Sequence, residues 1–212
     1  MIAKGTEKLY QDFLNTNSSR WEFGNSILYE MCSNNPYHNQ SDIIVGKIWI
    51  IGRSYAAAIE RRKNASNTNV DFYYDVVAPK MLEIGDELDE RLSQLRDDGG
   101  TIRENVKDIL ETHKFLMDVF YELTGLEKRS LASKYLHFHC PELFFIYDSR
   151  ARTAINRYVK RPDKKALDNI NCDKEYGDFV CRMLELQAFL QERTECNQSP
   201  RTLDSFLLQK GL

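Results

Sequence analysis

Apolar residues recur at intervals of three and four along most of the chain, and strict apolar–polar alternation is scarce. Intervals of three and four place apolar side chains on one face of a helix, whereas a half-buried strand requires a period of two. The pattern therefore predicts an all-α fold. The predicted helices cover about 7–14, 21–32, 42–63, 79–96, 101–124, 129–139, from 148 onward, 176–193 and from 202 onward.

The clearest interior break in this pattern is the DDGG sequence at residues 97–100. Clusters of aspartate and glycine favour loops over regular structure. Just after it, Thr101 and Glu104 have the spacing of a capping box, which favours a helix start. We predict one helical domain over residues 1–212, built as a bundle that can divide into two lobes near 97–100.

The composition supports a folded protein with a sizeable core. The chain has 212 residues, of which 42% are hydrophobic and 11% aromatic. No apolar run approaches the roughly 20 residues of a membrane span, and charges interrupt the first residues, MIAKGTEKLYQDF, where a signal peptide would be apolar. We expect a cytoplasmic protein without membrane contact. The five scattered cysteines favour neither a disulfide framework nor a zinc site, so we predict no metal and no cofactor.

Charge is unevenly distributed along the chain. The formal net charge is −3, but residues 128–165 contain ten basic and three acidic side chains. A local excess of positive charge favours phosphate binding. Arg150 and Arg152 are candidates for contacts with DNA phosphates, and ordinary surface charge is the alternative explanation.

The segment 123–152, LTGLEKRSLASKYLHFHCPELFFIYDSRAR, has the most specific pattern. It predicts a helix end, a turn at Gly125, a helix over 129–139, a proline-containing turn, an apolar run and a new helix that starts at Asp148. Aspartate is a favoured helix N-cap, which alone is sufficient reason for its presence. His137 and His139 point about 200° apart on such a helix and cannot chelate one ion there.

This order of parts resembles the helix-hairpin-helix DNA glycosylases. The blocks SLASKYLHFH, FFIYDSRA, GKIWIIGRSYAAAIERR and RTLDSFLL also resemble uncharacterised bacterial proteins with an 8-oxoguanine glycosylase-like fold. The resemblance implies a helix-hairpin-helix-like element around 110–140 and a protein that binds damaged duplex DNA and excises a modified purine. It also implies a catalytic role for Asp148 and DNA contacts from the hairpin: Gly125, Lys128, Arg129 and Ser130.

The lysine of the bifunctional glycosylases has two candidate positions. In strict register that position is Arg129, whose guanidinium stays protonated and cannot attack a sugar. Lys134 lies five residues later, about 140° around the helix. A desolvated lysine can attack the sugar carbon and form a Schiff base. An ordinary solvated lysine is the competing interpretation.

A flipped base requires aromatic surroundings. The candidates for the base pocket are Tyr135, Phe138 and Tyr147, with Phe144 and Phe145 nearby, although aromatic residues at helical spacing are more often core. The alternative function is a non-catalytic nucleic-acid or nucleotide-binding protein that retains the scaffold. Glu127, which replaces the second hairpin glycine of the family, and Arg129 favour it. The sequence does not indicate an oligomeric state.

Overall fold

The computed structural model describes residues 1–16, 21–62, 70–160, 162–194 and 198–210, and the fold is all-α. Within these ranges the only β-type pairing is an isolated bridge between Ile2 and Val159. A π-helical turn spans Phe72–Val77 and a 3₁₀ turn spans Lys165–Leu167. The α-helices are α1 (Thr6–Thr16), α2 (Glu22–Asn34), α3 (Ser41–Ser54), α4 (Ala78–Glu83), α5 (Gly85–Asp97), α6 (Val106–Thr124), α7 (Arg129–His139), α8 (Ser149–Tyr158), α9 (Lys174–Gln191) and α10 (Pro200–Lys210).

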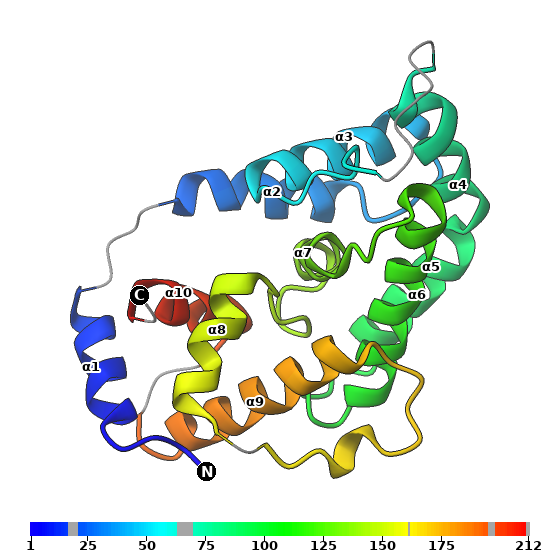
Figure 1. The fold of residues 1–212 in the computed structure, drawn as a ribbon. Helices are drawn as coiled ribbons and strands as arrows, with labels where there is room; N and C mark the ends of the chain where they lie inside the picture. Colours follow the sequence, from blue (N-terminus) through cyan, green and yellow to red (C-terminus); the bar gives the residue numbers. More distant parts are fainter. Residues whose placement is uncertain (17–20, 63–69, 161, 195–197, 211–212) are drawn as a thin grey trace.

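The centre of the molecule is α7. Figure 1 shows it end-on, with α2 and α3 on one side and α8 and α9 on the other. It packs against α2, α3 and α6, and every residue from Leu131 to His139 is buried. A helix enclosed on all sides is usually apolar throughout. This one instead buries five polar side chains, namely Ser133, Lys134, Tyr135, His137 and His139.

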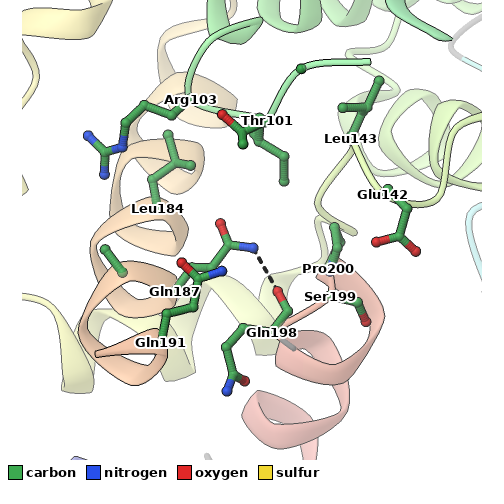
Figure 2. Close-up of a pocket in the computed structure, with 13 residues that line it drawn as sticks. Thr101, Arg103, Glu142, Leu143, Leu184, Gln187, Gln191, Gln198, Ser199 and Pro200 are labelled. Carbon is green, nitrogen blue, oxygen red and sulfur yellow. Dashed lines mark hydrogen bonds between the residues drawn. The ribbon is translucent and has the colours of Figure 1, made fainter. Parts of the chain in front are cut away.

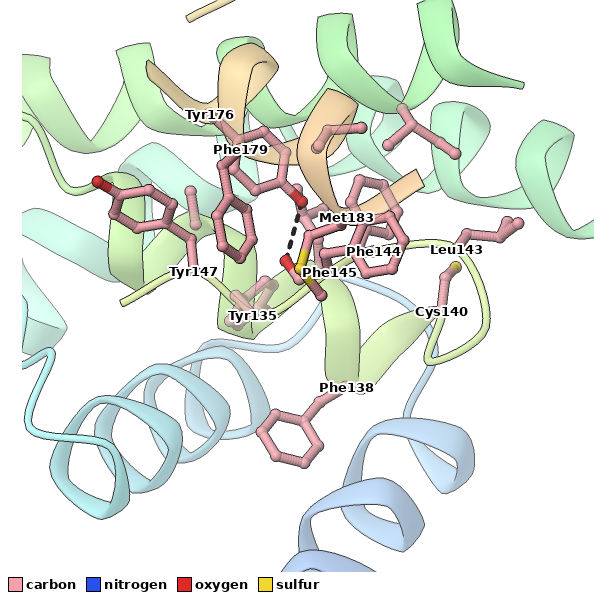
Figure 3. Close-up of a cluster of buried hydrophobic side chains, with 14 of the residues drawn as sticks. Tyr135, Phe138, Cys140, Leu143, Phe144, Phe145, Tyr147, Tyr176, Phe179 and Met183 are labelled. Carbon is pink, nitrogen blue, oxygen red and sulfur yellow. Dashed lines mark hydrogen bonds between the residues drawn. The ribbon is translucent and has the colours of Figure 1, made fainter. Parts of the chain in front are cut away.

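The apolar run that follows α7 forms the middle of the core. Figure 3 shows this run facing the aromatic side chains of α9. The rings of Tyr147 and Phe179 meet edge to face, with their centroids 5.2 Å apart. The buried hydroxyl of Tyr176 donates a hydrogen bond of 3.0 Å to the carbonyl of Phe145. Non-helical backbone is thereby tolerated inside the core, because its polar groups find partners.

The helix predicted over 42–63 is too long, because α3 ends at Ser54. The chain then reverses, and the amide of Ala57 donates to the carbonyl of Gly52 at 2.8 Å. A Cβ at Gly52 would come within 3.3 Å of the Ala58 backbone, so glycine allows the close return without a shift of that backbone. Ile59 remains fully buried outside the helix. The spacing of Ile59 from the other apolar residues therefore indicated that it is buried, and it did not indicate that it is helical.

The helix predicted over 79–96 is divided into α4 and α5 at Ile84. Gly85 begins α5 directly against the loop before α3. A Cβ at Gly85 would lie 2.6 Å from the carbonyl oxygen of His38. The break thus lets two backbone segments touch, and Leu88, Leu92 and Leu95 still form the buried face.

The elements predicted around the hairpin segment are present. Helix α6 ends at Gly125, which adopts a left-handed conformation with φ of 66°. Helix α7 begins at Arg129 and packs against α6. Of the loop predicted at 97–100, Asp97 is the last residue of α5, and 98–100 lie between α5 and α6. Thr101 and Glu104 bond to each other as in a capping box, although α6 itself starts at Val106. Among the described helices, none has the length and apolarity needed to cross a membrane.

Candidate functional site

Lys134 lies in the middle of α7 and is only 1% exposed. Its Nζ donates a hydrogen bond of 2.6 Å to Ser130 Oγ, one helical turn earlier, and lies 5.7 Å from the centre of the Tyr55 ring. Burial lowers the pKa of Lys134, and the nearby carboxylates of Asp148 and Asp204 partly offset this effect. Burial therefore makes the Lys134 ammonium easier to deprotonate than it is in water.

A second buried lysine provides a contrast. Lys47 is fully buried and donates to two backbone carbonyls, those of Asn35 at 2.9 Å and Tyr37 at 3.3 Å. These contacts tie the loop after α2 to α3, which is a structural role. Lys134 has one hydroxyl partner and two further N–H groups without a hydrogen-bond acceptor among the described residues. Its amine is thus the less satisfied of the two.

Asp204 of α10 also acts on Lys134, and it was not predicted as a site residue from the sequence. It is 2% exposed, and its Oδ2 lies 3.2 Å from Arg201 Nη1. Its Oδ1 is buried and has no hydrogen-bond partner among the described residues. Burial raises the pKa of Asp204 to about 7. An acid between Leu203 and Phe206, on the apolar face of the last helix, was the available signal, because an unpaired buried carboxylate is costly.

Asp148 is the N-cap of α8, as predicted, and its Oδ1 accepts a hydrogen bond of 2.8 Å from the Ala151 amide. The side chain is half-buried, and no hydrogen bond to its Oδ2 is present among the described residues. Its charge acts on both Lys134 and Asp204. Asp148 therefore caps its helix and belongs to the electrostatic cluster as well.

Tyr55, just after α3, connects these groups. Its hydroxyl donates to Asn25 Oδ1 at 2.7 Å and accepts from Arg201 Nη1 at 3.2 Å, while its ring contacts Lys134. Lys134, Asp148 and Asp204, with Tyr55 and Arg201, are called the lysine cluster below. Four segments of the chain thus contribute an amine, two carboxyl groups and a cation that act on one another electrostatically.

Arg129, the first residue of α7, is neutralised by carboxylates. It contacts Asp173 at 2.5 Å, Glu127 at 3.0 Å and Glu175 at 3.1 Å. The hydrogen bonds that Arg129 donates to Asp173 raise the pKa of Arg129. Arg129 therefore lies in an acidic network with α9 and does not join Lys134 in the lysine cluster.

The other predicted DNA contacts have separate environments. Lys128 donates to the carbonyl of Ala58 at 2.9 Å, and burial lowers its pKa. The hydroxyl of Ser130 accepts the hydrogen bond from Lys134. Arg152 lies 3.5 Å from Glu175, whereas Arg150 is exposed and has no ion pair among the described residues. Acids of α9 thus offset part of the positive charge of 128–165. Of the predicted contacts, Arg150 remains available to a phosphate.

The predicted base-pocket aromatics are all buried in the core. Tyr135 is fully buried, and its hydroxyl lies 2.8 Å from His38 Nε2. Phe138 is 2% exposed and its ring lies 5.5 Å from that of Tyr55. Tyr147 donates to Glu175 at 2.5 Å. Of the three, Phe138 borders the lysine cluster through Tyr55, and Tyr135 and Tyr147 face other groups.

A hollow of about 400 Å³ lies between the loop before α6, α9 and the start of α10 (Figure 2). Leu143 and Leu184 provide apolar wall, and Gln187 and Gln191 line it with amides. Gln187 Nε2 donates to the carbonyl of Gln198 at 2.7 Å, which leaves its Oε1 to face the hollow. Arg103 and Glu142 stand at opposite sides in this view. A second hollow, of about 470 Å³, includes Arg129 and its acidic partners, and neither Lys134 nor Asp148 lines either one.

Neither a metal site nor a known relative points to a function for this chain. Across the described ranges, no three histidine, cysteine, aspartate or glutamate side chains are grouped so that they could hold a metal ion. No family model matches the chain, and no curated protein or solved structure matches it significantly. The lysine cluster is therefore the feature of the structure that bears most on function.

Proposed function

We propose that this chain is a DNA glycosylase-like enzyme that releases a modified purine, with Lys134 as nucleophile and Asp148 as the acid that assists it. The observation that supports this most is the burial of Lys134, an amine on which the charges of Asp148 and Asp204 act. Perturbed titratable groups that gather in one place are typical of catalytic sites. The order of Gly125, α7 and Asp148 is also the order of parts in the helix-hairpin-helix glycosylases that the sequence resembles.

The chemistry follows from these groups. The neutral Lys134 amine attacks C1′ of the damaged nucleoside, and a C1′–N bond forms as the glycosidic C1′–N9 bond breaks. The purine leaves with the electron pair and takes up a proton. The carboxylate of Asp148 stabilises the positive charge that develops on the sugar, as carboxylates do in glycoside hydrolysis. Loss of a proton from the lysine nitrogen and opening of the sugar ring then give a Schiff base.

The test is base release from duplexes that carry oxidised or deaminated purines, with borohydride present to trap the lysine adduct. We expect release and a covalent adduct with at least one lesion. Asp148→Asn should reduce the rate by roughly 10²- to 10⁴-fold. Since asparagine caps helices as well as aspartate does, that loss would report charge rather than helix stability. A correctly folded protein without release or adduct on any lesion would overturn the proposal.

The DNA contact can be tested through Arg150. Phosphate contacts by unpaired cations release counterions, so each one adds to the salt dependence of binding. We expect Arg150→Ala to weaken binding to every duplex and to lower the salt slope by about 1. The matched control is Arg91→Ala on α5, because Arg91 already pairs with Glu87 at 2.7 Å. Equal effects of the two substitutions in a salt titration would exclude Arg150 as a phosphate contact.

The hollow in Figure 2 favours a second candidate, a nucleotide-binding protein that retains the scaffold without catalysis. The exposed Arg103 suits a phosphate, and its guanidinium has no ion pair among the described residues. The amides of Gln187 and Gln191 suit the polar edge of a base, and Leu143 and Leu184 suit its face. Pockets of this size and mixture bind small ligands.

This second candidate predicts that nucleoside monophosphates bind to the wild-type protein in calorimetric titrations. Arg103→Ala should weaken that binding by roughly 10- to 100-fold, because one charge-assisted hydrogen bond is lost. Lys134→Met should leave it unchanged, because Lys134 does not line the hollow. Absence of binding by the wild-type protein, or the opposite pattern between the two variants, would exclude this candidate.

A further inference from the structure

We propose that Ser130 and Lys134 form a nucleophile–base pair that hydrolyses carboxylic esters through an acyl intermediate on Ser130. The observation behind this is the hydrogen bond of 2.6 Å between Lys134 Nζ and Ser130 Oγ, one turn apart on α7. A nucleophile and a base within hydrogen-bond reach of each other are typical of covalent catalysis. This activity goes beyond the proposed function, because it requires no DNA and Lys134 takes up a proton without bonding to the substrate.

The kind of partner distinguishes this contact from a structural one. Lys47, the other buried lysine, donates to the backbone carbonyls of Asn35 and Tyr37, and a carbonyl has no proton to give. The hydrogen-bond partner of Lys134 among the described residues is a hydroxyl. A hydroxyl accepts from the ammonium form of lysine and donates to the neutral amine. Lys134 is therefore placed to remove the hydroxyl proton of Ser130.

The surroundings of Lys134 support its use as a base. The side chain is 1% exposed, and burial lowers its pKa. The carboxylates of Asp148 and Asp204 oppose this shift, and the charge of Arg150 adds to it. A base is most effective when its pKa lies near the working pH. The lowered pKa gives a larger fraction of neutral amine at neutral pH than an exposed lysine has.

Ser130 lies where α7 enters the core. It is half-buried, whereas every residue from Leu131 to His139 is buried. Side chains of a helix tilt toward its N-terminus, so the Ser130 hydroxyl is directed toward the outer end of α7. Lys134 approaches that hydroxyl from one turn deeper in the helix. A substrate can therefore meet the hydroxyl without reaching the buried amine.

The first turn of α7 also offers backbone donors. The amide of Ala132 makes the first helical bond, of 2.9 Å, to the carbonyl of Lys128, whose side chain does not cap the helix. The amides of Arg129, Ser130 and Leu131 have no hydrogen-bond acceptor among the described residues. Free amides at a helix start stabilise negative charge, as the donors of an oxyanion hole do. An ester carbonyl attacked by Ser130 thus has donors nearby for its developing charge.

The reaction balances with water as the second reactant. Lys134 takes the hydroxyl proton as Ser130 Oγ attacks the carbonyl carbon of the ester, and the electron pair of the C=O bond moves to oxygen. When this pair returns, the bond to the alcohol oxygen breaks, and the alcohol leaves with the proton from Lys134. Water then gives a proton to Lys134 and attacks the acyl carbon. Ser130 Oγ leaves and recovers that proton, and a carboxylic acid is released.

The pair is tested with a fluorophosphonate, which reacts with activated serines. The Oγ–P bond forms as fluoride leaves, and Lys134 takes the hydroxyl proton. Peptide mass spectrometry of the labelled wild-type protein locates the adduct. We expect Ser130 to react roughly 100-fold faster than Ser149, an exposed serine in the first turn of α8 whose hydroxyl has no hydrogen bond among the described residues. Equal rates, or no label on Ser130, would overturn the inference, whether or not the protein releases bases.

Substitutions separate the two roles. Hydrolysis of 4-nitrophenyl acetate should fall by roughly 10²- to 10⁴-fold in Ser130→Ala and in Lys134→Met, and Ser149→Ala should keep the wild-type rate. Lys134→Met should also slow the labelling of Ser130 by a similar factor. Labelling at the wild-type rate in this variant would exclude Lys134 as the base. If the variant did not fold, labelling of the wild-type protein would still decide, and borohydride trapping on DNA remains a separate test of the proposed function.

Discussion

Replacement of Lys134 by methionine is expected to abolish adduct formation and to lower base release by on the order of 10³-fold or more. The amine is the only nucleophile of the proposed reaction, and methionine fills a similar volume without it. The free energy of unfolding should stay within about 1 kcal/mol of the wild type or rise, because an apolar side chain often replaces a buried charged one without loss. Trapping gels and thermal unfolding measure the two effects.

The matched control is Lys107→Met. Lys107 is an exposed lysine on α6 and has no hydrogen bond among the described residues. The Lys107→Met substitution should leave both adduct formation and the free energy of unfolding unchanged. If Lys134→Met retained the adduct, the nucleophile would be another residue. If instead it unfolded the protein, Lys134 would have the structural role that Lys47 has.

The protein is expected to lose stability as the pH falls from about 6.5 to about 4. All four histidines are buried. Burial lowers the pKa of His113 and of His137 to about 4, and it also lowers the pKa of His38 and His139. The unfolded chain then binds protons at a higher pH than the folded one. Below the unfolded pKa each proton taken up therefore favours unfolding.

The size of this effect is considerable. His113 and His137 each contribute on the order of 3 kcal/mol between the two pKa values. Asp204 acts in the opposite direction, because its raised pKa favours the folded state as the pH falls, and it offsets roughly one histidine. Urea unfolding at a series of pH values measures the balance. A free energy of unfolding that stays constant down to about pH 4 would contradict the prediction.

His139 allows a sharper version of this test. Both of its ring nitrogens are buried and have no hydrogen-bond partner in the described part of the chain. Besides burial, the charges of Lys47, His38 and Arg96 lower the pKa of His139. His139→Phe should raise the free energy of unfolding at neutral pH by about 1–3 kcal/mol and reduce its loss in acid. Gln94→Met, at an exposed position of α5, is the control and should do neither.

The local elements of the hairpin segment could be predicted because their signals are local. Gly125 adopts the left-handed conformation that glycine allows, and Asp148 accepts the backbone bond expected of an N-cap. The C-terminal end of α3 and the break before Gly85 could not be predicted. Both depend on a second backbone segment that lies against a glycine, and this segment is close only in the folded chain.

The candidate site was predictable to a lesser degree. Lys134 and Asp148 were proposed from their order in one segment, and the fold places their charges near each other. Asp204 comes from α10, more than fifty residues later, and Tyr55 from the turn after α3. Periodicity assigns a residue to a face but does not identify which faces meet. The ion pair of Arg129 with Asp173, the N-cap of α9, could not be predicted for the same reason.

The enclosure of α7 determines where motion can occur in this molecule. A helix surrounded by other helices exchanges its amide hydrogens last, since exchange there requires the whole domain to open. The amine of Lys134, the proposed nucleophile, is therefore carried by the most enclosed helix described. Under the proposed function, a substrate reaches this amine only when outer helices are displaced, and the rate of that displacement sets an upper limit on turnover.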